Sequence, residues 1–130
     1  MAIPPIVLTV MMCDAVHRDR DTGKWYLMGA FNRLSFREFP TTVPAIQVFL
    51  GLIEDNGIFD LRLRIVDVNE EDEPIHELAG QLEGRDPLKL FDFPITLANV
   101  RFPEAGEYRL QVLVAGEVIA ERKLAINQTS

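Results

Sequence analysis

The sequence predicts an all-β fold, an antiparallel β-sandwich of seven or eight strands that forms one domain over residues 1–130. Runs rich in Val, Ile, Leu and Phe recur between Pro-, Gly- and Asp-rich turn signals. Their spacing of about ten residues is typical of sandwiches. Helical periodicity is weak throughout, and the length suits one domain with its own core.

Composition excludes several classes of protein. Hydrophobic residues make up 48% of the chain and charged residues 25%, values typical of a globular protein. The formal charge of -7 and the scattered 13 Lys and Arg argue against a nucleic-acid partner. Cys13 is the one cysteine, so no disulfide can join the sheets. Residues 2–16 lack a basic leader and are too short to span a bilayer, so we expect a cytoplasmic location without a membrane partner.

The first half of the sequence predicts three strands. We expect strands over residues 6–16 and 24–36, joined by a polar turn that ends at Gly23. Within the second, Gly29 indicates a bulge or a close backbone approach, and Trp25 is expected to anchor the core. A third strand is expected over residues 45–54.

Two turn signals flank that third strand. Pro40 and Pro44 cannot donate ladder hydrogen bonds, which suits a crossing from one sheet to the other. Asp55-Asn56-Gly57 favours a tight hairpin, so we expect the third and fourth strands to pair antiparallel.

The fourth strand shows the clearest alternation in the chain. Leu61, Leu63 and Ile65 alternate with Arg62, Arg64 and Val66. Because successive side chains of a strand point to opposite faces, we expect the face of Leu61, Leu63 and Ile65 to be buried and the opposite face to be largely solvated.

The sequence signals for the remaining strands differ in strength. A weaker strand is expected near residues 75–81, and an irregular strand after Pro87 within the difficult segment 83–97. Residues 107–115 and 117–126 predict a hairpin that turns at Ala115-Gly116. In its second strand the apolar residues change from one set of alternate positions to the other, which indicates a bulge near Glu121 and Arg122.

The acidic loop over residues 67–74 contains the one weak metal candidate. Asp67, Asn69 and Glu71 have the spacing of the first three ligands of a calcium loop. Asp72 then replaces the required glycine and Leu78 replaces the bidentate glutamate. We therefore expect a solvated turn and no bound metal or cofactor.

Nucleophilic chemistry finds no support in the sequence. Cys13, Asp14 and His17 are close in sequence, but neighbouring residues of a strand point to opposite faces. Free cysteines are usually buried, so we expect Cys13 to act as a small core side chain. The two serines, Ser35 and Ser130, lie outside any nucleophile motif. No catalytic residue is predicted.

The run from Phe102 to Tyr108 carries the most specific structural signal. It resembles the Asp-x-Gly-x-Tyr entry to the penultimate strand of immunoglobulin-like sandwiches, with Gly106 at the glycine and Tyr108 at the corner tyrosine. The resemblance implies a hydroxyl bond back to the main chain. Leu110 stands where antibody domains have their second disulfide cysteine, which argues against an extracellular immunoglobulin role.

Several segments together resemble one family. They are Cys13-Asp14, Leu27-Met28-Gly29-Ala30-Phe31, Phe39-Pro40 and the corner from Phe102 to Tyr108. They look like an uncharacterised bacterial family, a domain of unknown function, of small immunoglobulin-like sandwiches. The resemblance implies a fold and supplies no reaction, ligand or site residue.

These observations favour a non-enzymatic cytoplasmic sandwich that associates with itself or with a protein partner through edge strands. The first and last strands are expected to be the edges most open to pairing. The alternative is a small-ligand or carbohydrate-binding module in which Trp25, Tyr26 or Phe31 stacks on a flat ligand. An enzyme with no recognisable motif is the third hypothesis.

Overall fold

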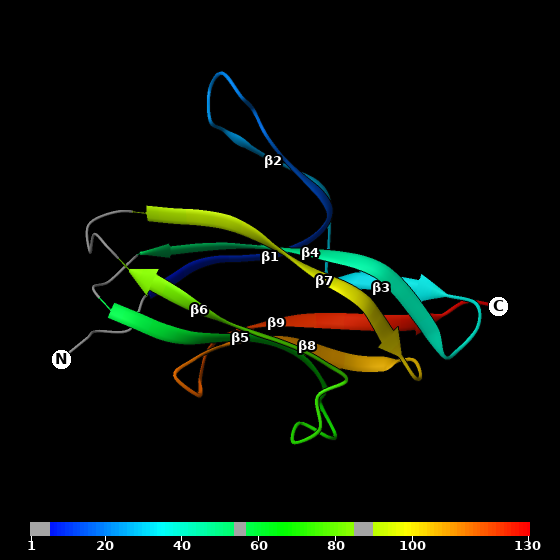
Figure 1. The fold of residues 1–130 in the computed structure, drawn as a ribbon. Coiled ribbons are helices and arrows are strands. Elements are labelled where there is room, and N and C mark those ends of the chain that lie inside the picture. The colour runs from blue at the N-terminus through cyan, green and yellow to red at the C-terminus, as the bar shows by residue number, and fades with distance from the viewer. Residues whose placement is uncertain (1–5, 54–56, 85–89) are drawn as a thin grey trace.

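The computed structural model describes residues 6–53, 57–84 and 90–130, which form nine strands in two facing sheets (Figure 1). The strands are β1 (Ile6–Arg18), β2 (Trp25–Phe31), β3 (Arg33–Phe36), β4 (Thr41–Ile53), β5 (Gly57–Asp67), β6 (His76–Gly84), β7 (Leu90–Phe102), β8 (Gly106–Val114) and β9 (Glu117–Gln128). One sheet has the order β2-β1-β4-β7 and the other β3-β9-β8-β5-β6. The all-β prediction is confirmed, with nine strands in place of seven or eight. No helix in the described ranges is long and apolar enough to cross a membrane.

The core lies between the two sheets and follows the two-residue period of strands. On the four-stranded sheet it includes Val48 and Leu50 of β4, and on the five-stranded sheet Leu63 of β5 and Val112 of β8. All four are 1% exposed or less. The buried face predicted for the fourth strand is confirmed, with Leu61, Leu63 and Ile65 buried, but Val66 on the opposite face is also buried, so that face is not solvated along its whole length.

One long apolar run is divided between the sheets. The single strand expected over residues 24–36 is wrong, because β2 pairs with β1 whereas β3 runs parallel to β9 in the other sheet. Gly29 has φ of 68°, and a Cβ there would collide with the Asp14 side chain. The predicted close approach at Gly29 is thus made by a side chain of the paired strand.

The end of β1 and β2 rise from the four-stranded sheet as an arm, whereas the first part of β1 stays paired with β4 in the sheet (Figure 1). At its outer end, next to the turn, the Trp25 ring meets the Phe49 ring edge-on, with centroids 5.4 Å apart. Phe49 alternates with core residues of β4 and so lies on the outer face of the four-stranded sheet. The Arg18 guanidinium lies 5.1 Å from the Trp25 ring. Trp25 therefore covers an outer face and is half-buried, which corrects its expected place in the core.

The connections on either side of β4 both change sheet. β3 belongs to the five-stranded sheet and β4 to the four-stranded sheet, so the crossing predicted at Pro40 is confirmed. β4 starts at Thr41 and includes Pro44, earlier than expected. The hairpin predicted between the third and fourth strands is wrong, because β4 and β5 lie in different sheets. Residues 54–56 of that turn fall outside the described residues.

The segment over residues 83–97 contributes to an edge strand. Residues 85–89, including Pro87, lie outside the described residues, and β7 beyond them pairs with β4 along its whole length. It forms the outer edge of the four-stranded sheet, where the missing donor of Pro94 is tolerated.

The C-terminal hairpin forms as predicted. Ala115 and Gly116 have φ of 51° and 83°, the two positive values that a tight primed turn requires. The pairing of β8 and β9 shifts register between Val112 and Leu113, which leaves Ile119 as the extra residue. The predicted bulge therefore exists, but it lies before Glu121 and Arg122.

Candidate functional site

The first and last strands are not edges of the sheets. β1 lies between β2 and β4, and β9 lies between β3 and β8, because β2 and β3 add to them from the middle of the chain. The expectation that β1 or β9 is the most open edge is therefore wrong. The outer strands are β2 and β7 in one sheet and β3 and β6 in the other.

An apolar groove lies between β6 and β7, the outer strands on one side of the sandwich. It has a volume of about 230 Å³. Its apolar walls come from β5 and β6 of one sheet and β7 of the other: Leu61, Leu63, Leu78, Leu82, Phe93 and Ile95. Since β6 and β7 end their respective sheets, this side of the core is closed by side chains alone.

Small residues of β6 shape the groove. Gly80 is opposite Leu61 in the ladder, between Leu78 and Leu82 on the core-facing side of β6. A Cβ built on Gly80 meets nothing within 4 Å, and its φ lies outside the left-handed region. The groove thus exists partly because this core-facing position carries no side chain.

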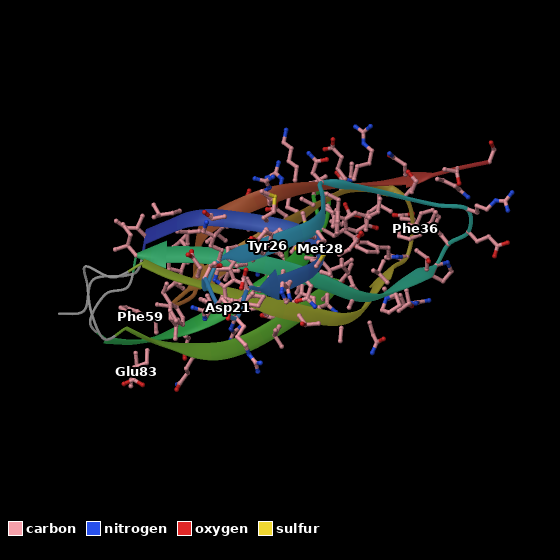
Figure 2. All side chains as sticks on the ribbon, turned by 90° about the horizontal axis from the view of Figure 1, so that it is seen from above. Asp21, Tyr26, Met28, Phe36, Phe59 and Glu83 are labelled. Atoms are coloured by element: carbon pink, nitrogen blue, oxygen red, sulfur yellow. The ribbon has the colours of Figure 1, made fainter. Side chains whose placement is uncertain are left out.

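The side chains along the groove differ in exposure. Leu61 and Leu82 are each 7% exposed, whereas Leu78 on β6 is 40% exposed. Phe91 of β7, which packs on the groove residue Phe93 and is outside the lining, is 37% exposed. Figure 2 shows Phe59 and Glu83 at the end of the sandwich where β5 begins and β6 ends. The sequence signal for this groove is Leu-Ala-Gly-Gln-Leu, a strand with small residues at its centre. A glycine inside a strand marks a place where another backbone can approach closely.

The outer face of the five-stranded sheet is covered by its own polar side chains. Arg64 Nε donates to Gln111 Oε1 at 2.6 Å, and Gln111 Nε2 donates to Glu121 Oε1 at 2.9 Å. Arg109 lies 3.4 Å from Glu121 and 3.7 Å from Glu71. Gln111 is 2% exposed, and these contacts satisfy its amide. The network links three strands of this face.

The acidic loop does not bring its three candidate ligands into one cluster. Asp67 Oδ1 accepts the main-chain N–H of Asn69 at 2.9 Å, a local turn contact. The Glu71 carboxylate instead faces Arg109 on β8. Among the described residues no group of three His, Cys, Asp or Glu could hold a metal ion. The loop folds as a turn, and the expectation that it binds no metal stays untested.

Cys13, Asp14 and His17 lie along β1 without forming a catalytic group. Cys13 is fully buried, while Asp14 and His17 are exposed. Burial, together with the negative charge of Asp14, raises the pKa of the Cys13 thiol. A raised pKa leaves less of the reactive thiolate at neutral pH, so the environment opposes nucleophilic use of Cys13.

The corner before β8 has the contact that the sequence implied. The Tyr108 hydroxyl donates to the main-chain oxygen of Glu104 at 2.7 Å. Its ring is 1% exposed and lies edge-on to Phe102, with centroids 5.2 Å apart. Burial raises the pKa of the Tyr108 phenol. Gly106 begins β8, and Leu110, two residues beyond Tyr108 on the same strand, is fully buried.

The three aromatic residues considered for ligand stacking do not form one platform. Trp25 packs on Phe49, and Phe31 packs partly against the core. Tyr26 is 50% exposed, with its ring 6.4 Å from that of His17. In Figure 2 Tyr26 and Met28 lie on the arm, above the four-stranded sheet. Tyr26 is therefore the most accessible ring of the three.

Residues 8–127 match a family of unknown function, DUF6941. The chain belongs to this family. No curated protein matches the chain. The family covers both sheets of the sandwich, and the groove between β6 and β7 lies within its range.

Proposed function

We propose that this DUF6941 protein is a non-enzymatic, cytoplasmic association module that binds a second copy of itself or a partner protein at the groove between β6 and β7. The observation that carries the proposal is an apolar groove bounded by two outer strands. Outer strands present unpaired main-chain groups, and an apolar opening beside them offers buried area to an incoming segment.

The size of the groove favours protein side chains over a free ligand. Pockets that bind small molecules usually enclose roughly 300–1,000 Å³. The groove has about 230 Å³. An apolar cavity of about 150 Å³ accepts a benzene ring, so this groove has room for one or two apolar side chains.

We also propose that the sandwich is of the immunoglobulin type. The order β1-β4-β7 corresponds to strands A, B and E of that fold, and β9-β8-β5-β6 corresponds to G, F, C and C′. The tyrosine corner at Tyr108 in β8, the counterpart of strand F, supports this assignment. In the described chain no strand occupies the position of D beside β7. The groove opens at that side.

Gly80→Val is the variant that tests the function. Valine fits the extended backbone and would fill the groove without contacting a neighbour at Cβ. Wild type and variant would be compared by light scattering with size exclusion over a range of concentrations, and by retention of lysate proteins on the immobilised chain. We expect an assembly or retained partner that the variant loses. A monomeric wild type that retains the same proteins as the variant would refute the proposal.

The small-ligand or carbohydrate module is the second candidate, supported by the exposure of Tyr26. It predicts that a soluble glucose hexasaccharide perturbs the amide resonances of β2 and that Tyr26→Ala removes this effect. Unchanged spectra at millimolar sugar would refute this prediction.

A further inference from the structure

The free edge of β6 is better suited to strand addition than the facing edge of β7. β6 pairs with β5 over its whole length on one side, and it ends the five-stranded sheet on the other. Its nine residues include no proline. β7 has Pro94 in its first half, where an added strand would lack a donor. The main chain of β6 therefore offers the more complete set of hydrogen-bonding groups.

An added strand would place alternate side chains in the groove. The core-facing side of β6 has Gly80 between Leu78 and Leu82. Because paired residues of neighbouring strands share a face, a side chain beside Gly80 would enter the space above Leu61. Apolar residues at every second position of the added strand would thus complete the core.

The remaining positions of the added strand would lie beside the glutamates of β6. β6 contains Glu77 and Glu83 and no Lys or Arg, and both glutamates are on the outer face of its sheet. Both residues already interact within the chain, Glu77 with Arg62 of β5 at 3.2 Å, but an ionised carboxylate can accept further hydrogen bonds. The whole chain has a formal charge of -7. Opposite charges directly across a ladder stabilise strand pairing, so basic residues fit these positions.

The sequence of β5 shows which kind of strand pairs with β6. On the paired side of β6 it presents Leu61, Arg62, Leu63, Arg64 and Ile65, an alternation of apolar and basic residues. We infer that β6 binds, on its free side, an extended partner segment of the same kind, with apolar side chains in the groove and Lys or Arg along the acidic face. This inference rests on the proposed function and names the chemistry of the partner.

The probe is a nine-residue peptide of alternating Val and Arg, acetylated and amidated at its ends. Its control replaces each Arg by Glu. Binding to wild type and to Gly80→Val would be measured by calorimetry at about 0.15 M salt, where Debye screening acts over about 8 Å. We expect the Arg peptide to bind wild type at least tenfold more tightly than the Glu peptide. We also expect Gly80→Val to weaken the Arg peptide at least tenfold while the variant keeps its circular dichroism spectrum.

Hydrogen exchange provides a second readout that needs no variant. The Arg peptide should slow amide exchange within residues 76–84. Equal affinity for wild type and Gly80→Val without this protection would show adsorption by charge alone and overturn the inference. Protection confined to β7, or no binding to wild type, would overturn it as well.

The two proposals can fail separately. If wild type retains a protein that Gly80→Val loses, but the Arg peptide does not bind, then association stands and the chemistry of the segment is wrong. If neither retention nor peptide binding depends on Gly80, then both are wrong.

Discussion

Replacing Tyr108 by Phe tests the corner that joins β7 to β8. The change removes one hydroxyl and keeps the ring that packs edge-on against Phe102. The lost interaction is the 2.7 Å bond to the main-chain oxygen of Glu104. A hydrogen bond of this kind contributes a net stability of roughly 0.5–1.5 kcal/mol. Glu104 itself is exposed, so water can reach its carbonyl, and we expect a loss of about 1 kcal/mol.

That loss converts to a measurable shift in Tm. At about 2.1 cal/mol/K per residue, the unfolding entropy of a chain of this length is roughly 270 cal/mol/K, so about 1 kcal/mol lowers Tm by about 4 °C. Differential scanning calorimetry would compare wild type, Tyr108→Phe and the control Tyr26→Phe, which removes a hydroxyl from a half-exposed ring. We expect the control to stay within about 1 °C, since surface changes cost little. Equal Tm values for the two variants would refute the role of the corner.

Further changes test the core, the hairpin and two titratable groups. Leu110→Ala should cost about 2–5 kcal/mol in urea unfolding, because it leaves a cavity in the core, whereas Leu78→Ala at a partly exposed position should cost less. Ala115→Asn should raise the unfolding free energy by about 1 kcal/mol, because Asn tolerates the positive φ; an unchanged urea midpoint would count against strain there. Cys13 should react with a thiol reagent only as fast as the protein opens, and rapid modification of the native protein would show that the thiol is accessible. Burial raises the pKa of Tyr108 above its usual value of 10.0, so the folded state holds this proton more tightly than the unfolded state. The stability advantage of wild type over Tyr108→Phe should therefore be complete below pH 10 and shrink as the pH rises beyond it, and a constant difference would contradict this.

Local signals predicted the parts of the fold that local contacts determine. The Ala115-Gly116 hairpin follows from turn chemistry, and the burial of Leu63 follows from strict alternation. The tyrosine corner is also local, since Tyr108 bonds to a residue four positions earlier. Each of these features has its cause within about ten residues of sequence, the scale at which periodicity and turn signals act.

Features that depend on distant pairing were missed. Asn56-Gly57 has the composition of a hairpin, yet the strands on either side belong to different sheets, because β4 finds its partners in β1 and β7. Similarly, no local signal shows that the strand run around Phe31 is divided between two sheets. The groove was missed for the same reason. Gly80 reads as a weak point of a strand until the free edges of β6 and β7 are known to face each other.

The parallel pairing of β3 with β9 has a consequence for how the protein folds. Arg33 pairs with Ala125, so the two strands meet only after most of the chain lies between them. Closing so long a loop costs entropy before the contact stabilises anything, and topologies of this kind fold slowly. β8 and β9, joined by a tight turn, can pair first and present the edge on which β3 docks. During synthesis β3 therefore has no strand to pair with in its sheet until β9, the last strand, has been made.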